Sequence, residues 1–368
     1  MIRLGILGCG DVAFRTYFPA LQRIAADEAR VTVCYDPLPD RAARAAALVP
    51  GAIAVTTLEA LLAAPGLDGV FNLTPAPLHA ETTRACLDAG LHVFSEKPIA
   101  ASVADAAALA AHAAARGKVL LCAPAVVATE RWRWLRRAIA AGAIGRPTLA
   151  TAQMANMGPA GWRAYTGDPA VFYRAGVGPL IDHGIYQLAA ILAIFGPAKR
   201  VQAMGGITIP RREVQIPRLA GQVIEVTEPD HMLVSLDFGD AFAQIVASFA
   251  VPRSKAPALE IHGTGGTISI PMGSWYDAAG PVDIFRRDPS PLGVEGWMDG
   301  VASPEASGGG HLIGSGPVHF VRVLRGEEAP LLTADFATHT LEVMLLAHQA
   351  IADGRALATT TTFTLPTA

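Results

Sequence analysis

The chain has 368 residues, of which 51% are hydrophobic and 17% charged, and its formal net charge is −3. The length predicts two domains, and the composition is typical of a well-buried globular protein rather than a disordered one. The small net charge, without a long run of one sign, argues against a nucleic-acid or anionic-membrane partner, and no stretch approaches the roughly 20 apolar residues of a spanning helix.

Strand and helix patterns alternate over residues 1–124. Such alternation predicts a parallel, doubly wound sheet covered by helices on both faces, that is, an α/β Rossmann domain. The expected strands are 3–7, 30–35, 69–73, 91–95 and 119–122, and the expected helices are 13–26, 40–48, 58–63, 79–89 and 103–115.

The character of the chain changes after residue 124, and strands dominate. Residues 125–368 predict an α+β domain for substrate binding and oligomerisation, with a large, mainly antiparallel open sheet and with last helices that could pack back on the first domain. Gly239-Asp240 is a hairpin signal. We expect a long loop at 288–316 and a final strand that includes 359–362. The other expected elements are helices 130–141, 180–194, 318–324 and 335–352 and strands 148–154, 200–204, 231–238, 241–249, 258–262, 267–270 and 282–286.

The first residues already have the pattern of a buried strand, and nothing ahead of them resembles a cleaved leader, so we expect a cytoplasmic protein. The four cysteines form no C-x-x-C pair, and we expect buried, reduced thiols. They are Cys9, Cys34, Cys86 and Cys122.

A glycine-rich turn, Gly8-Cys9-Gly10-Asp11-Val12-Ala13, follows the first strand and opens the first helix. Gly8 permits the tight turn, Gly10 lets the backbone approach a pyrophosphate, and Ala13 allows close helix–strand packing. The amide groups that begin the helix, from Asp11 and Val12 onward, would face the anion. The turn therefore predicts dinucleotide binding.

Asp36 ends the second strand, 26 residues after Gly10. A carboxylate at this position accepts hydrogen bonds from ribose hydroxyls and repels a 2′-phosphate. We therefore expect NAD, and NADP less.

Three further patterns are Thr74-Pro75-Ala76-Pro77-Leu78-His79, Glu96-Lys97-Pro98, and the segment from Gly176 to Tyr186, Gly-Val-Gly-Pro-Leu-Ile-Asp-His-Gly-Ile-Tyr. The first two follow the carboxyl ends of predicted parallel strands, where open α/β sheets bind ligands. Together with the glycine turn, these patterns resemble the Gfo/Idh/MocA oxidoreductase family over essentially the whole chain.

The resemblance implies roles for the matching residues. Lys97 would be catalytic, beside the nicotinamide, and Lys97-Pro98 is a plausible cis peptide. Asp182 matches the family's aspartate on the substrate side. The position four residues later is usually histidine but is Tyr186 here, as in members related to glucose–fructose oxidoreductase and dihydrodiol dehydrogenase. The residues that would line the cofactor are Thr74, Pro75, His79 and Glu96.

The chemistry of alcohol oxidation also favours this set. It removes a hydride from carbon and a proton from oxygen, so an acid–base group must reach the hydroxyl. Asp182 and Tyr186 are four residues apart on a predicted helix and would share one face. A nearby Lys97 cation would favour loss of the Tyr186 proton. If Tyr186 only packs in the core, His183 is the alternative acid–base group.

Weaker candidates surround this set. Substrate contacts are expected from Trp162, Arg163 and Tyr173, and more weakly from Tyr165 and Arg174, because indole and guanidinium groups suit hydroxyl-rich ligands. Trp297 and His311 could reach the site from this or a neighbouring subunit. The ten histidines form no H-x-H or H-E-x-x-H pattern, so no metal is expected.

These features predict an NAD-dependent oxidoreductase that acts on a secondary alcohol or ketone of a sugar, cyclitol or related polyol. Two alternatives stay open. One is a lyase or glycosidase that uses tightly bound NAD in a transient oxidation, elimination and reduction; the other is a non-enzymatic NAD-sensing protein. We expect a homodimer or homotetramer formed through the C-terminal sheet.

Overall fold

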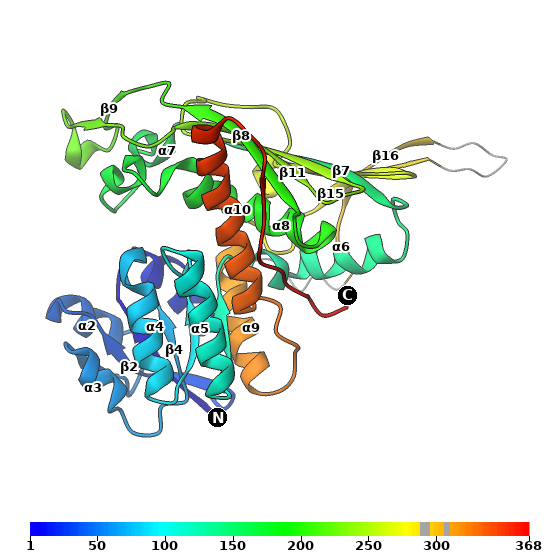
Figure 1. The fold of residues 1–368 in the computed structure, drawn as a ribbon. Coiled ribbons are helices and arrows are strands. Elements are labelled where there is room, and N and C mark those ends of the chain that lie inside the picture. Colours follow the sequence, from blue (N-terminus) through cyan, green and yellow to red (C-terminus); the bar gives the residue numbers. More distant parts are fainter. Residues whose placement is uncertain (288–294, 305–309, 368) are drawn as a thin grey trace. The chain divides into compact units, whose positions relative to one another are not determined.

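The computed structural model describes residues 1–287, 295–304 and 310–367 (Figure 1). Two compact units divide the chain. Unit 1 comprises residues 1–129, 310–341 and 361–367, and unit 2 comprises residues 130–309 and 342–360. The described helices are α1 (Phe18–Leu21), α2 (Pro39–Ala46), α3 (Leu58–Leu62), α4 (His79–Asp88), α5 (Val103–Ala115), α6 (Glu130–Ala140), α7 (Gly158–Gly161), α8 (Ile185–Phe195), α9 (Ser315–Leu324) and α10 (Ala334–Asp353).

Unit 1 is built on a six-stranded sheet in the order β3-β2-β1-β4-β5-β6, and every neighbouring pair is parallel. The predicted Rossmann architecture is confirmed. Residues Leu4–Leu7 of the central strand are completely buried, as expected when helices cover both faces. The strands are β1 (Ile2–Leu7), β2 (Ala29–Tyr35), β3 (Ile53–Val55), β4 (Gly69–Asn72), β5 (His92–Ser95) and β6 (Leu120–Cys122).

An aromatic cluster joins distant parts of unit 1. The ring of Phe320, on α9, lies with its centroid 5.4 Å from Phe71 and 5.9 Å from Phe94, on neighbouring strands β4 and β5. Tyr17 meets the same two rings at 5.6 and 6.1 Å. These edge contacts are favourable arrangements for aromatic pairs, and they fix α9 to the strands that lead into the cofactor loops.

Unit 2 contains a nine-stranded sheet in the order β16-β15-β14-β13-β7-β12-β11-β8-β17, antiparallel except between β7 and β12. The mainly antiparallel sheet and the hairpin at Gly239-Asp240 are confirmed. Helix α8 packs against β7 and β12, with α6 beside it (Figure 1). Among the described residues, no helix covers the other face of the sheet, on which Leu149, Phe242 and Met204 are exposed. The strands are β7 (Pro147–Ala155), β8 (Arg200–Gly206), β11 (His231–Asp237), β12 (Phe242–Ser248), β13 (Leu259–Gly263), β14 (Gly266–Ile270), β15 (Val282–Arg287), β16 (Glu295–Val301) and β17 (Leu357–Ala358), besides a small hairpin of β9 (Arg211–Glu213) and β10 (Val223–Glu225).

Three local expectations were wrong. Residues 295–301, expected in a loop, form β16, so Trp297 lies on a strand and its ring meets Phe285 of β15 at 5.7 Å. Residues 359–362 follow the two-residue strand β17 and are not part of it. The helix expected at 13–26 is a π-helical turn (Ala13–Tyr17) followed by the short α1. Part of the expected loop, 288–294 and 305–309, lies outside the described residues.

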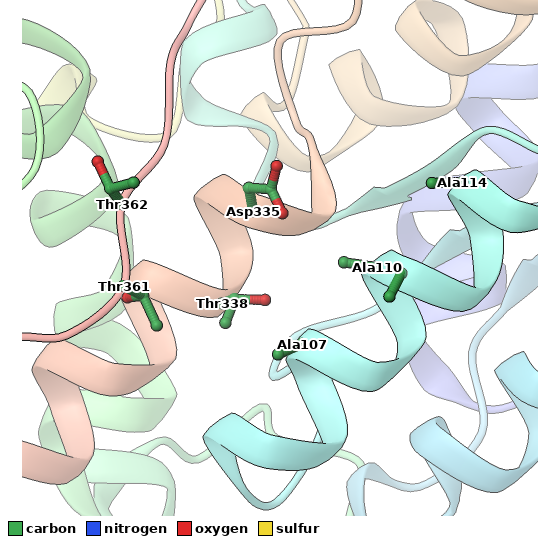
Figure 2. Close-up of a pocket in the computed structure, with 8 residues that line it drawn as sticks. Ala107, Ala110, Ala114, Asp335, Thr338, Thr361 and Thr362 are labelled. Carbon is green, nitrogen blue, oxygen red and sulfur yellow. The ribbon is translucent and has the colours of Figure 1, made fainter.

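A groove of about 330 Å³ lies between α5 and the first part of α10 (Figure 2). Alanine methyl groups of α5 line one side, and Asp335 and Thr338 of α10 line the other. None of the residues expected in the active site lines this groove.

Candidate active site

The glycine turn follows β1 and has room on its outer side. Gly8 has φ +99°, and a Cβ atom there would lie 2.7 Å from the carbonyl oxygen of Leu73, so only glycine fits. A Cβ atom on Gly10 would meet nothing within 4 Å. This open space over the Gly10 backbone suits a pyrophosphate, because the anion must approach main-chain amides closely.

Asp36 is buried at the end of β2, beside the glycine turn. Its Oδ2 atom accepts the N–H of Cys9 at 3.0 Å, and its Oδ1 atom accepts the N–H of Leu38 at 3.0 Å. The carboxylate thus holds the turn in place. Asp11 behaves differently, since its side chain pairs with Arg15 at 3.0 Å on the surface.

The loop after β4 is organised by Asn72, a residue that the sequence analysis missed. Its Oδ1 atom accepts both the N–H and the hydroxyl of Thr74, at 3.3 and 2.7 Å, and its Nδ2 atom donates to the carbonyl of His79 and to two threonine hydroxyls. The sequence signal that could have identified it is a single asparagine at the end of an otherwise apolar strand. An amide in that position is buried and needs hydrogen-bond partners, as the structure shows.

His79 links the loop after β4 to the loop after β5. Its Nδ1 atom lies 2.6 Å from the carbonyl oxygen of Pro98, and its Nε2 atom lies 2.8 Å from that of Thr74. The ring is buried at the beginning of α4. It therefore sets the distance between the Thr74-Pro75 segment and the lysine motif.

Lys97 follows β5 and is fixed through its neighbour Glu96. One carboxylate oxygen of Glu96 accepts the hydroxyl of Tyr17 at 2.9 Å, and the other accepts the N–H of Lys97 at 3.1 Å. The Lys97-Pro98 peptide is cis, as expected. Close by, burial raises the pKa of the Cys122 thiol well above its ordinary value, with Glu96 adding to the effect and Lys97 opposing it.

Asp182 and His183 lie on a π-helical turn (Leu180–Gly184), and Tyr186 lies on α8, which follows it directly. The helix expected at 180–194 is present, and all three residues belong to it, but its first turn is π-helical rather than α-helical. Such π-turns are frequent at functional sites because they change the direction in which side chains point. The Nε2 atom of His183 lies 3.4 Å from Oδ2 of Asp182.

Aromatic and amide neighbours surround this segment, and the sequence did not indicate them. The amide of Asn156 lies 3.5 Å from Nδ1 of His183, and the ring of Phe249 meets the imidazole at 5.9 Å. Tyr186 is buried, with its ring 5.6 Å from that of Tyr276. These neighbours come from distant segments, so local pattern could not predict them.

The weaker candidates occupy different environments. Trp162 is exposed, and its ring lies tilted against that of Tyr165, with the centroids 5.6 Å apart. Tyr173 is buried against Phe249, its hydroxyl accepts the N–H of Ala160, and burial raises its pKa to about 12. Arg163 and Arg174 are exposed. His311 is exposed and belongs to unit 1, and Trp297 belongs to unit 2.

The expected site residues divide cleanly between the units. Unit 1 gathers the glycine turn, Asp36, the Thr74–His79 loop, Glu96 and Lys97 at the carboxyl edge of one sheet, while Asp182, His183 and Tyr186 belong to unit 2. Among the described residues, no group of three or more His, Cys, Asp or Glu side chains is placed to hold a metal ion.

Unit 1 has a parallel sheet, a glycine turn with room for a pyrophosphate, and a lysine at the same carboxyl edge of that sheet. This combination is typical of a dinucleotide-binding protein of the oxidoreductase class. Residues 2–123 match the family model described as an oxidoreductase family with an NAD-binding Rossmann fold, and residues 132–269 match the Gfo/Idh/MocA C-terminal domain. The chain belongs to the Gfo/Idh/MocA oxidoreductase family.

Curated relatives include sugar reductases and cyclitol dehydrogenases. A dTDP-3,4-didehydro-2,6-dideoxy-alpha-D-glucose 3-reductase of Streptomyces antibioticus is 30% identical over 276 residues, which cover 71% of this chain and 80% of the relative. A reductase of the same name from Streptomyces violaceoruber is 33% identical, but the match spans only 56% of it. The scyllo-inositol 2-dehydrogenase (NADP(+)) of Bacillus subtilis is 26% identical over 73% of this chain and 76% of that protein.

Solved structures share the whole fold at low identity. The WlbA dehydrogenase of Bordetella pertussis, in complex with NADH and UDP-GlcNAcA, has a TM-score of 0.75 at 18% identity, with 98% of each chain covered. The super-repressor mutant of Gal80p from Saccharomyces cerevisiae has a TM-score of 0.78 at 17% identity, covering 97% of this chain and 98% of that one. Because one of these is a dehydrogenase and the other a repressor, fold likeness alone does not define activity.

Among the described residues, no helix combines the length and apolar character needed to cross a membrane.

Proposed function

We propose that this protein is an NAD-dependent oxidoreductase that moves a hydride between the nicotinamide and a secondary alcohol or ketone of a sugar, cyclitol or related polyol. The observation that carries the proposal is the position of Lys97. It follows β5 at the same edge of the sheet as the glycine turn after β1, and Glu96 fixes its backbone there. The names of the curated relatives, which act on sugars and inositol, support the substrate class.

The chain's own residues would handle the proton and the orientation of the substrate. When bound, the dinucleotide supplies or accepts the hydride. Tyr186 takes the hydroxyl proton during oxidation and returns it during reduction. In this proposal a Lys97 cation near the tyrosine would favour its deprotonated form, and Asp182 would orient the substrate hydroxyls. His183 replaces Tyr186 in this role if the tyrosine only packs against Tyr276.

The cofactor-binding residues in this proposal are Gly8, Gly10, Asp11, Val12, Asp36, Thr74, Pro75, His79, Glu96 and Lys97. Trp162, Arg163 and Asp182 would contact the substrate. Tyr173, also expected to contact it, is buried with its hydroxyl bonded to the N–H of Ala160 and the carbonyl of Met157, so we propose instead that it supports the surrounding segment. We propose NAD over NADP because the buried Asp36 carboxylate would repel a 2′-phosphate. Two curated relatives are named as NADP(+) dehydrogenases, so the preference for NAD over NADP is tested by mutation of Asp36 below.

A substrate panel tests the proposal. Sugars, cyclitols and other polyols are incubated with NAD, and NADH absorbance and product mass are followed together, with heat-treated protein as the control. Stoichiometric NADH and a product two mass units lighter support the oxidoreductase. Turnover without net NADH would instead support the lyase or glycosidase cycle. NAD binding without turnover of any member, unchanged in Lys97→Ala, would support an NAD-sensing protein.

We also propose a homodimer or homotetramer built on the open face of the unit 2 sheet. Strand register aligns one row of side chains across eight strands, and these are Trp297, Phe285, Thr267, His262, Leu149, Phe242, Asp237 and Arg200. Phe242 is 55% exposed, and in a second row Met204 is 72% exposed beside Leu233. Exposed apolar side chains gathered on one sheet face are typical of an interface.

Light scattering tests the assembly. Phe242→Asp should reduce the molar mass of the wild-type oligomer to that of the monomer, because it buries a charge in the proposed interface. Ile53→Asp, an equally exposed apolar position in unit 1, is the matched control and should leave the mass unchanged. A monomeric wild-type protein overturns the proposal.

The buried, unbridged cysteines support a cytoplasmic location.

A further inference from the structure

Two buried carboxylates, Glu228 and Asp230, stand just before β11, where Pro229 separates them. A buried carboxylate is costly unless hydrogen bonds compensate for its lost hydration. Asp230 is compensated by Arg212, at 2.7 Å, and by Thr208 and Ile209. Glu228 is engaged by an entirely different part of the chain.

Glu228 binds the segment that leads into the Asp182 turn. Its Oε2 atom accepts the N–H of Gly176 at 2.7 Å. Gly178 packs closely against the Glu228 side chain. A Cβ atom at Gly178 would lie 3.0 Å from the Cγ atom of Glu228 and 3.1 Å from the carbonyl oxygen of Pro229. Gly178 also has φ +62°, so a side chain is disfavoured there on two grounds. The Glu228 side chain therefore fixes both the position and the direction of the backbone at Gly176–Gly178.

His348 holds Glu228 from the other side. Its Nδ1 atom lies 2.6 Å from Oε1 of Glu228, and because a carboxylate only accepts, Nδ1 carries the hydrogen. The Nε2 atom of His348 is buried without a hydrogen-bond partner among residues 1–287, 295–304 and 310–367. His348 thus interacts by hydrogen bonding with Glu228 alone within that part of the chain. Burial raises the pKa of Glu228, but the bonds from His348 and Gly176 outweigh it, and the net shift is downward.

The anchored segment leads directly into the residues proposed to react, Asp182 and His183. Only Pro179 stands between Gly178 and the π-helical turn that carries Asp182 and His183. A displacement of the anchored segment is transmitted directly to these side chains, and an error of about 1 Å in a reacting geometry can cost on the order of a hundredfold in rate.

We propose that Glu228, supported by His348, is a positioning residue that fixes the Gly176–Gly178 segment and through it sets Asp182 and His183 for the reaction. Glu228 itself does not touch the substrate. This inference rests on the proposed function, but its first test does not.

Hydrogen exchange followed by mass spectrometry provides that test. In Glu228→Ala the Gly176 amide loses its acceptor, and peptides from 174–186 should exchange about ten times faster or more. Glu228→Gln retains an acceptor oxygen and should exchange close to wild type. The matched control is Glu225→Ala, which removes an exposed carboxylate of the same unit. Unchanged exchange in Glu228→Ala overturns the proposal.

Kinetics then separate positioning from general stability, with the panel polyol of highest kcat/KM and NAD as probes. Glu228→Ala should lower kcat/KM for the polyol about 50- to 100-fold and leave the Kd for NAD within twofold, and Glu228→Gln should recover most of the loss. Ile261→Ala, a cavity in the core of the same unit, controls for destabilisation and should keep near-normal kcat/KM below its Tm.

Two kinetic results would overturn the inference: near-wild-type kcat/KM in Glu228→Ala, or an equal loss in Ile261→Ala. If no polyol turns over, the proposed function fails, while the exchange comparison still decides whether Glu228 anchors the segment.

Discussion

The hydroxyl of Tyr17 donates a 2.9 Å hydrogen bond to the carboxylate of Glu96. Tyr17 belongs to the π-helical turn after the glycine turn, and Glu96 precedes Lys97, so one bond joins the dinucleotide-binding and lysine motifs of unit 1. Tyr17 is fully buried, with its ring against Phe71 and Phe94. The position of Lys97 therefore depends on packing beneath the cofactor turn.

Tyr17→Phe removes this bond while keeping the ring. We expect the free energy of unfolding to fall by about 1.5–3 kcal/mol, as for hydrogen bonds to charged groups, and kcat/KM to fall with it because Glu96 and Lys97 are less well fixed. Urea unfolding and steady-state kinetics of Tyr17→Phe, Glu96→Ala and the double variant form a double-mutant cycle, because each single substitution removes the bond between these two residues. If the two losses simply add, the residues are not coupled and the interpretation fails.

Lys97→Ala and Tyr186→Phe should each lower kcat by roughly 10²–10⁴, the usual contribution of acid–base groups, with the Kd for NAD nearly unchanged. Lys118→Ala is the control for lost charge, because Lys118 precedes β6 at the opposite edge of the same sheet. Wild-type turnover in Tyr186→Phe would exclude the tyrosine and make His183 the acid–base residue.

Asp36→Asn should weaken discrimination against NADP. The amide keeps an acceptor oxygen for only one of the two backbone N–H groups, that of Cys9 or that of Leu38, and it loses the charge that repels a 2′-phosphate. We expect the ratio of kcat/KM for NAD to that for NADP to fall about tenfold or more, equivalent to ~1.4 kcal/mol. Asp40→Asn, on the neighbouring α2, should leave the ratio unchanged. An unaltered ratio in Asp36→Asn would mean that another residue sets the preference.

Two neighbouring arginines offer a matched test of stability in unit 2. Arg212 pairs with Asp230 in the interior, whereas Arg211 pairs with Glu225 on the surface. Arg212→Met should lower the free energy of unfolding by about 3–5 kcal/mol, since it leaves a buried carboxylate unpaired. Arg211→Met should change it by less than about 1 kcal/mol. Urea unfolding measures both, and equal losses would contradict the argument.

The same carboxylate should govern part of the acid unfolding. Burial raises the pKa of Asp230, but hydrogen bonds from Thr208, Arg212 and Ile209 more than reverse this, so the folded pKa lies below the ordinary value of 3.8. Its stabilising contribution is thus complete above that value and is lost as the pH falls through the folded pKa. Between pH 5 and pH 3, Asp230→Asn should therefore lose less stability than the wild type. A parallel decline in both proteins would refute this linkage.

How far the sequence predicts the molecule depends on the range of the interaction. The glycine turn, five of the six strands of the parallel sheet, and the hairpin at Gly239-Asp240 were predicted correctly, because backbone preference and side-chain periodicity act within a few residues, whereas the short strand β3 was missed. The π-helical turns and β16 were also missed. Strand pairing with β15 outweighs the local loop composition around residue 297.

The sequence by itself determined the Rossmann domain, the mainly antiparallel second sheet and the motifs that belong to the family. Only the tertiary structure revealed what holds those motifs. Asn72 organises the Thr74 loop, Tyr17 holds Glu96, and Asn156 and Phe249 border His183, while Glu228 anchors Gly176. Except for Asn72, these partners are separated by tens of residues. Their contacts arise from the packing of whole elements, for which local sequence carries no signal.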